Sequence, residues 1–444
     1  MADMTERLTD ADYTPPLPRA AALGVQHVLA MFASNVTPAI IVAGAAGLAG
    51  AEKVFMVQMA VLFAGLATLM QTIGIGKIGA RLPIMQGTSF AFVPIMIPIA
   101  QNAGMAAIFG GVVIGGIFHF LVGMFVIGRI RKYLPPLITG LIVLSIGIAL
   151  IPVGIQYAAG GVWAMNNKPE IFGTLENWTM ALVVVFVTLG IKFFARGFMT
   201  SAAALVGLVA GYVAALLMGK VQFMQIAEAG WLAPPVPFRF GFEITFAAVA
   251  GFCLMTLVSA VETVGDISGV AKAGANREAT KKEITGGTMA DGLGTAVAGI
   301  FGGLPNTSFS QNVGLIGLTG VMSRHVVSIG AVFLIAAGLV PKIGAIVASM
   351  PVPVLGGGVI VMFGMVAAAG LNMLSDVKMT RRNMVILAVS LSVGMGLKAV
   401  PLAVQFLPET ARLLLTTGLL PVAVIAFVLN IALPENEEKE TKTG

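Results

Sequence analysis

The sequence contains little charge, little histidine and almost no cysteine. Aspartate, glutamate, lysine and arginine make up 10% of its 444 residues, whereas a soluble domain carries about 25%. A chain this poor in charge is not an ordinary soluble protein. The single cysteine, Cys253, excludes an intramolecular disulfide, and three histidines form no cluster at metal-ligand spacing. Phosphate-binding glycine loops and nucleophile–base patterns are also missing from the sequence. We therefore expect no metal, no cofactor, and neither enzymatic nor ATP-driven activity.

Apolar segments long enough to cross a bilayer follow one another along the whole chain. The residues are 57% hydrophobic and include 55 glycines, and a helical span needs about 20 mainly apolar residues. We predict an all-α membrane protein with about fourteen transmembrane segments. Uninterrupted spans are expected near residues 21–44, 54–75, 106–127, 137–156, 176–194, 199–218, 244–263, 286–302, 325–343, 353–370, 382–398 and 413–432.

Two further crossings are short and interrupted, near residues 84–99 and 306–321. The second begins in a half-polar stretch, Leu304 to Gly320, where a proline and small residues oppose a continuous helix. We expect extended backbone from Asn306 to Ser310, followed by a half-helix. Irregular backbone at membrane depth is tolerated where it lines a cavity, and a half-helix N-terminus presents N–H groups to the occupant. A re-entrant turn or a polar packing face is the alternative for this stretch alone.

Short motifs recur in the two halves of the chain. Leu82–Phe90 contains Leu-Pro followed by Thr-Ser-Phe, and so does Leu304–Phe309. Leu134–Leu137 and Met350–Pro353 each place two prolines at the opening of a span. An odd number of segments in each half, about seven, predicts two inverted repeats, each with one broken segment made of a short strand and a half-helix. Chance similarity of short strings is the alternative for either pair by itself.

Positive charge is concentrated in alternate loops. The positive-inside rule therefore predicts that both termini face the cytoplasm, in a multi-pass protein of the cell (inner or plasma) membrane. Because the net charge of +6 sits in these short loops, it points to the lipid bilayer as a partner and not to nucleic acid. The loops placed inside hold Lys77, Arg81, Arg129, Arg131, Lys132, Lys192, Arg196, Lys272, Arg277, Lys281, Lys282, Arg324, Lys378, Arg381 and Arg382.

Three acidic residues lie within or beside apolar segments. Glu262 and Asp266 are four residues apart near the end of the span at 244–263, which places them on one helix face. An intramembrane carboxylate is costly in lipid, so these side chains should face a cavity or the protein interior. Asp291 stands near the start of the next span. The structural alternatives are a pair bonded to backbone at a helix end and, for Asp291, a helix cap or a group that orients the broken segment.

Aromatic and hydroxyl side chains follow both broken strands. Ser89 and Phe90 occupy this place in the first half, and Ser308 and Phe309 in the second. A phenylalanine can stack on a planar ring while neighbouring backbone N–H groups bind the edge of that ring. Plain packing is the usual role of such a residue, and only the repeat favours a binding role here. His27 lies inside the first span, where a lone histidine is more often structural than a proton carrier.

Gln311-Asn312-x-Gly314-x-x-x-x-Thr319-Gly320 resembles the signature of the nucleobase–ascorbate transporter family of nucleobase–cation symporters. The resemblance implies that Gln311 and Asn312 contribute to a substrate site. A glutamine at the first position is typical of members that carry xanthine or uric acid, whereas uracil carriers tend to have glutamate. The chain thus looks similar to bacterial xanthine and uric acid permeases.

The same resemblance extends to the acids and to the first span. In Val-Glu-Thr-Val-Gly-Asp, Glu262 matches the substrate-binding glutamate of the family and Asp266 a position linked to coupling and proton handling. Asp291 corresponds to an aspartate that is functionally important in xanthine-type members. Gln26-His27 resembles a pair in which the histidine, here His27, is thought to organise the site.

Nearly the whole chain is covered by this resemblance, which also implies its division into domains. A core takes residues 20–132 and 241–345 and a gate takes 133–235 and 350–433, with cytoplasmic tails at 1–19 and 434–444. The implied function is proton-coupled import of a purine base, xanthine and/or uric acid, by an elevator-like movement of core against gate in a homodimer. The alternatives are a uracil permease of the same fold and an anion transporter or channel built on the same inverted repeat.

Overall fold

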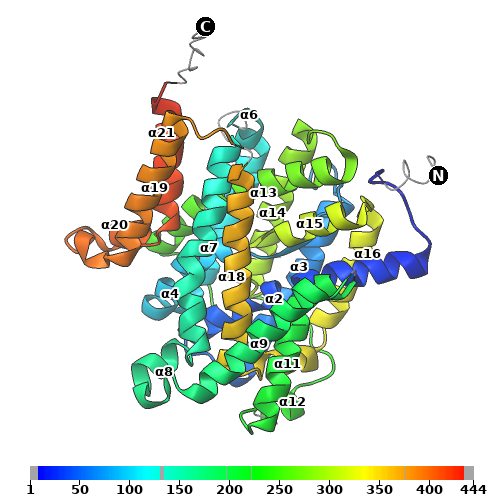
Figure 1. Ribbon diagram of the computed structural model, residues 1–444, viewed down its shortest axis with the longest axis vertical. Coiled ribbons are helices and arrows are strands. Elements are labelled where there is room, and N and C mark those ends of the chain that lie inside the picture. The colour runs from blue at the N-terminus through cyan, green and yellow to red at the C-terminus, as the bar shows by residue number, and fades with distance from the viewer. Residues whose placement is uncertain (1–8, 131–134, 197, 222, 376, 435–444) are drawn as a thin grey trace.

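The computed structural model describes residues 9–130, 135–196, 198–221, 223–375 and 377–434. The chain is mostly helical (Figure 1) and contains two short strands. Arg131, Lys132 and Leu134 lie outside the described residues, as do residues 1–8 and 435–444 of the two predicted tails. The first half forms α2 (Leu17–Ala45), α3 (Gly50–Thr72), β1 (Gln86–Thr88), η1 (Phe90–Phe92), α4 (Val93–Asn102), α5 (Gly104–Val122), η2 (Gly123–Ile127), α6 (Gly128–Ile130), α7 (Pro136–Ala158), α8 (Val162–Asn167), η4 (Pro169–Ile171), α9 (Leu175–Phe194), α10 (Phe198–Ser201), α11 (Ala203–Leu217) and α12 (Met224–Glu228). The second half forms α13 (Phe246–Ala275), α14 (Lys281–Ile300), β2 (Asn306–Ser308), α15 (Ser310–Thr319), α16 (Arg324–Gly338), α17 (Pro341–Ala348), α18 (Val352–Ser375), α19 (Arg381–Ala399), η5 (Pro401–Val404), α20 (Glu409–Leu415) and α21 (Leu419–Ala432).

Within the described ranges, eight helices are long and apolar enough to cross a membrane, or ten if each of two bent pairs is one span. The bent pairs are α16 with α17, at 82°, and α20 with α21, at 78°. This makes the chain a multi-pass membrane protein but does not confirm fourteen segments. Some of the other predicted segments are too short or too polar to count as spans. The helices α4 and α15 have ten residues each, α11 has fifteen, and α14 is rich in glycine and polar residues.

The two broken segments meet at the centre of the molecule, as short antiparallel strands. Gln86 pairs with Ser308, and Thr88 pairs with Asn306. Gly87, at the middle of β1, has no room for a side chain, because a Cβ there would come within 2.6 Å of the Phe309 ring. Each strand is followed by a half-helix, η1–α4 after β1 and α15 after β2, as the sequence predicts.

Side chains from neighbouring helices accept hydrogen bonds from backbone N–H groups at the outer edges of the two paired strands. Asn35 in α2 accepts from the backbone N–H of Thr88 at 2.8 Å, and Thr68 in α3 accepts from that of Gln86 at 2.9 Å. On the other strand, Thr295 in α14 accepts from the backbone N–H of Asn306 at 3.0 Å. Water is absent from the bilayer core, so these side chains replace it as partners for the exposed backbone.

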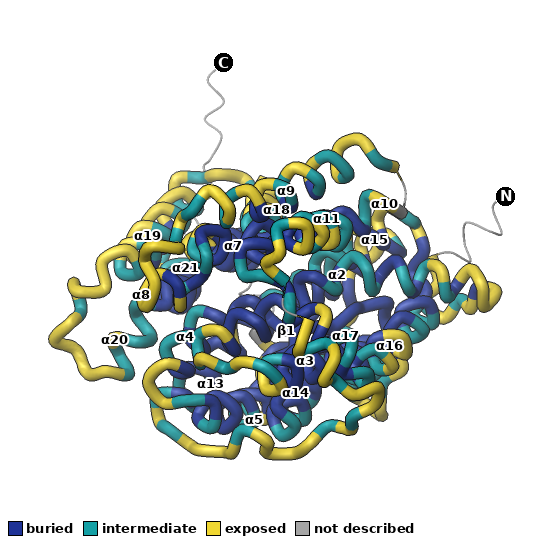
Figure 2. Tube along the Cα trace, turned by 90° about the horizontal axis from the view of Figure 1, so that it is seen from below, coloured by how far each residue is buried: buried dark blue, intermediate teal, exposed yellow. Residues whose placement is uncertain are grey.

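The helices pack into two groups, with α2 and β1 between them (Figure 2). On one side α7, α9, α11 and α18 pack together, and on the other α3, α5, α13, α14 and α16 do so. Contact between α7 and α18 is especially close, since a Cβ on Gly356 would lie 2.1 Å from the Ala158 nitrogen and one on Gly370 2.2 Å from the Leu144 nitrogen. The glycine run at 356–358 therefore serves close helix packing.

The helix α13 is longer than the span expected from the sequence. It continues to Ala275 and ends at Asn276, whose φ of 48° is the left-handed conformation that stops a helix. The prediction that Glu262 and Asp266 stand near the end of this helix is therefore wrong, because both lie in its middle. Beyond the turn, α14 begins with a capping box of Thr280 and Glu283, and Arg277 pairs with Glu283 at 2.6 Å.

Candidate functional site

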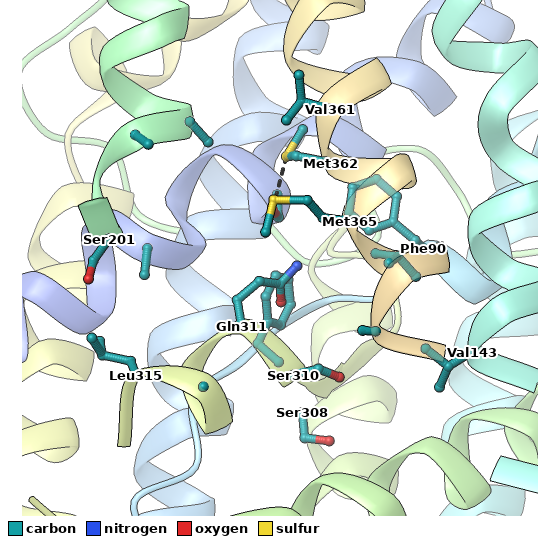
Figure 3. Close-up of a pocket in the computed structure, with 18 of the residues that line it drawn as sticks. Phe90, Val143, Ser201, Ser308, Ser310, Gln311, Leu315, Val361, Met362 and Met365 are labelled. Atoms are coloured by element: carbon teal, nitrogen blue, oxygen red, sulfur yellow. Dashed lines mark hydrogen bonds between the residues drawn. The ribbon is translucent and has the colours of Figure 1, made fainter. Parts of the chain in front are cut away.

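A cavity of about 480 Å³ lies between the two groups of helices (Figure 3). Its volume falls in the range of about 300–1,000 Å³ that small-molecule sites occupy. One side is formed by α2, α13, the end of β2 and α15, and the other by α7, α9, α10, α11 and α18. The broken segment at β2–α15 therefore lines a cavity, which is the condition under which irregular backbone is tolerated at membrane depth.

Glu262 enters this cavity from the middle of α13. Its Oε2 atom is buried, and no described protein group lies within hydrogen-bonding distance of it. A buried carboxylate oxygen without a partner is energetically costly, and N–H donors on a bound molecule can offset that cost. Gln311, one residue into α15, lines the same cavity and directs its amide towards the methionines of α18 (Figure 3).

Asp266 lies one turn along α13 from Glu262, yet its carboxylate is engaged by the protein itself. Ser308 donates to Oδ2 and Ser310 donates to Oδ1, both at 2.7 Å. The two hydroxyls come from the last residue of β2 and the first residue of α15. Asp266 therefore links α13 by hydrogen bonds to the junction between β2 and α15, directly before Gln311.

Two phenylalanine rings border the cavity, and each is fixed by its neighbours. Phe90 meets Phe363 of α18 edge to face, with the ring centroids 5.0 Å apart. Phe309 is 5% exposed and lies over Gly87 of the opposite strand. Rings that are held in place offer flat apolar surface at little cost in conformational entropy.

Ser89, Asn312, His27 and Asp291 lie close behind this wall and do not line the cavity. Ser89 caps η1 by accepting from the Ala91 N–H at 3.3 Å, while its own N–H pairs with the Pro305 carbonyl at 2.8 Å. That N–H is therefore not available to bind the edge of a ring.

The other three residues connect helices. Asn312 donates its side-chain amide to Nδ1 of His27 at 3.0 Å and to the His27 carbonyl at 3.1 Å, which ties α15 to α2. Asp291, fully buried in α14, accepts from Gln71 at 2.7 Å and from Thr263. Its surroundings are those of a group that orients helices, one of the alternatives that the sequence leaves open.

Several residues of the cavity were not predicted from the sequence. Met362 and Met365 of α18 face Gln311 across the cavity (Figure 3), and Ser34 of α2 donates to the Met362 sulfur at 3.0 Å. Methionines in an apolar span carry no signal that separates a site from packing. The polar residues at 34, 35 and 37 inside the first span are such a signal, since intramembrane polar groups are rare without a purpose.

Together these features define a membrane transporter, in which a central cavity between two groups of helices is met by two broken segments. The model of the Permease family (Xan_ur_permease) matches residues 19–403, and the chain belongs to this family. Its members are transporters and not enzymes. The uric acid permease PucK of Bacillus subtilis is 37% identical to the chain over 412 residues, which cover 92% of this chain and 94% of PucK. The xanthine permease XanP of Escherichia coli is 33% identical over 450 residues, which cover 98% of this chain and 96% of XanP.

Solved structures with a similar fold belong to more distant transporters. The transmembrane domain of the cyanobacterial bicarbonate transporter BicA aligns with a TM-score of 0.60 at 16% identity, covering 93% of this chain and 97% of that domain. The murine anion transporter Slc26a9, in its inward-facing state, aligns with a TM-score of 0.60 at 13% identity, covering 94% of this chain and 68% of that one. At these identities the likeness shows the fold alone.

Proposed function

We propose that the protein imports purine bases, xanthine and/or uric acid, across the cell membrane by proton-coupled secondary transport. The observation that carries this proposal is the pairing of Glu262 and Gln311 on one wall of a cavity bordered by Phe90 and Phe309. An oxidised purine is flat and has ring N–H donors and carbonyl acceptors along its edges. A carboxylate accepts from the N–H groups, an amide both donates and accepts, and the phenylalanine rings cover the flat faces.

The relatives support the same substrate class, because PucK is a uric acid permease and XanP a xanthine permease. In the site we assign Glu262, Gln311, Ser308, Phe90 and Phe309 to the base itself. Ser89 and Asn312 are assigned to the support behind it, on account of their hydrogen bonds to the protein.

We further propose that the chain consists of two inverted repeats of seven segments. Support comes from β1 and β2, which pair antiparallel through matching motifs and each lead into a half-helix. We assign residues 20–132 and 241–345 to a core and 133–235 and 350–433 to a gate, in agreement with the two groups in which the helices pack. Because the cavity lies between the groups, an elevator-like movement of one past the other can expose it to alternate sides.

For the coupling proton we propose Asp266, with Asp291 and His27 as the next candidates. A proton taken up by Asp266 would weaken its acceptance from Ser308 and Ser310, and so would alter the attachment of the half-helix that carries Gln311. We place the protein in the membrane as a homodimer, with both termini on the cytoplasmic side, as the distribution of Lys and Arg indicates.

Uptake by cells that express the chain tests the proposed function. Radiolabelled xanthine and uric acid should accumulate above the level in cells with an empty vector. Unlabelled xanthine, uric acid, hypoxanthine, guanine, adenine, uracil and bicarbonate are then added as competitors, and the oxidised purines should compete best. Strong competition by uracil or bicarbonate, with none by the purines, would overturn the proposed substrate.

A further inference from the structure

A hydrogen bond in the wall of the cavity joins α2 to α18 and bears on how the site selects its substrate. The Ser34 hydroxyl of α2 donates to the Met362 sulfur of α18 at 3.0 Å, and the bond is drawn dashed in Figure 3. Both residues line the cavity, and both are almost fully buried, with 3% and 5% of their surfaces exposed. A polar donor and its partner therefore belong to the wall that a bound base would touch.

The choice of partner is unusual for a serine inside a helix. Several other buried hydroxyls in the described helices donate back to the carbonyl four residues earlier, as Thr37, Thr68 and Ser145 do, each at 2.7 Å. Where a buried hydroxyl of a long helix does donate to another segment, as Ser259 does to Thr307 at 3.3 Å, the acceptor is an oxygen. The hydroxyl of Ser34 instead points across to the neighbouring helix. A thioether sulfur is a weak acceptor, so this bond holds the hydroxyl less firmly than a carbonyl would.

We propose that Ser34 is a specificity-determining residue of the base site, whose hydroxyl leaves the Met362 sulfur to donate to a carbonyl oxygen of the bound base. The inference rests on the proposed function, since it needs a substrate with carbonyl oxygens. Glu262 and Gln311 bind the base from α13 and α15, whereas Ser34 contributes a donor from α2. The exchange favours oxidised purines, because a carbonyl oxygen accepts better than a thioether.

The test compares xanthine with thioxanthines, in which one ring carbonyl oxygen is replaced by sulfur. Binding is measured by equilibrium titration of purified wild-type protein and of Ser34→Ala, with the folded fraction checked by size-exclusion chromatography. For the thioxanthine altered at the contacted carbonyl, wild type should prefer xanthine by about 2- to 12-fold, the worth of one net hydrogen bond. In Ser34→Ala that preference should vanish. The same preference in both proteins, or an equal loss of affinity for every ligand, would overturn the inference.

Met362→Leu is the matched variant, because it removes the sulfur acceptor and keeps the size of the side chain. In this variant the Ser34 hydroxyl has no partner in the empty cavity. The protein should therefore bind xanthine as tightly as wild type does, or up to about 10-fold more tightly. A loss of xanthine affinity as large as that of Ser34→Ala would make Met362 itself the contact and overturn the proposal. If wild type binds neither xanthine nor uric acid, the proposed function fails. If wild type binds them and Ser34→Ala keeps the same preference for xanthine over the thioxanthine, only the role of Ser34 fails.

Discussion

Replacing Glu262 by glutamine should separate substrate binding from protein stability. The Oε2 atom of Glu262 has no hydrogen-bond partner among the described residues and is buried beside the cavity. The empty protein therefore gains nothing from the charge, and Glu262→Gln should leave its thermal unfolding temperature unchanged or raise it. A bound base, in contrast, should lose one charge-assisted hydrogen bond, because the amide nitrogen of glutamine opposes a ring N–H donor.

The size of the binding defect follows from that single bond. A hydrogen bond to a charged group contributes about 1.5–3 kcal/mol, and about 1.4 kcal/mol corresponds to a tenfold change in affinity. Glu262→Gln should therefore bind xanthine about 10- to 150-fold more weakly. Titration of the purified protein with labelled xanthine measures this, and uptake by cells at matched surface expression should fall in parallel.

Asp291→Asn is the matched control, since it neutralises a second buried carboxylate of the same helical group. Asp291 accepts from Gln71 and Thr263 and does not line the cavity. Its variant should lose thermal stability and keep its xanthine affinity, which is the opposite pattern. If Glu262→Gln binds xanthine as well as wild type does, or destabilises the empty protein as Asp291→Asn does, Glu262 is not the acceptor for the ring N–H groups of the base.

Three other variants address substrate choice, coupling and stability. Gln311→Glu removes the amide donor and should weaken xanthine and urate transport by about tenfold while changing the ranking of competing analogues; an unchanged inhibition profile would place Gln311 outside the site. Uptake should rise at acidic external pH, need no sodium and collapse with a protonophore, and Asp266→Asn should still bind purine but accumulate it poorly; full, protonophore-sensitive accumulation would move the proton elsewhere. Although burial raises the pKa of Glu283, its hydrogen bonds to Arg277 and Thr280 outweigh burial and hold that pKa below its ordinary value. The stability that Glu283 contributes is thus present above its unfolded-state pKa of about 4.3 and is lost as the pH falls. Glu283→Gln should be less stable at neutral pH by about 0.2–1 kcal/mol, as expected for an exposed pair, and equal to wild type in acid; a difference independent of pH would contradict this.

The sequence by itself determined the membrane class, most of the helices and the place of the two broken segments. Hydrophobic runs long enough to span a bilayer require helices, because no other open structure satisfies its backbone there. Pro83 and Pro305, each followed within a few residues by Thr-Ser-Phe, marked the strands that the structure shows at Gln86–Thr88 and Asn306–Ser308. The motif that begins at Gln311 likewise led to the family to which the chain belongs.

Only the tertiary structure decided which polar residues face the cavity. Glu262 and Asp266 are equivalent on a helix diagram, yet Glu262 opens into the cavity while Ser308 and Ser310 engage Asp266. The donors that distinguish the two acids come from a segment more than forty residues away. Likewise, the bond from Ser34 joins helices that are 328 residues apart in sequence. Local patterns record helix faces, but hydrogen-bond partners depend on how distant segments pack, and only the folded chain brings those segments together.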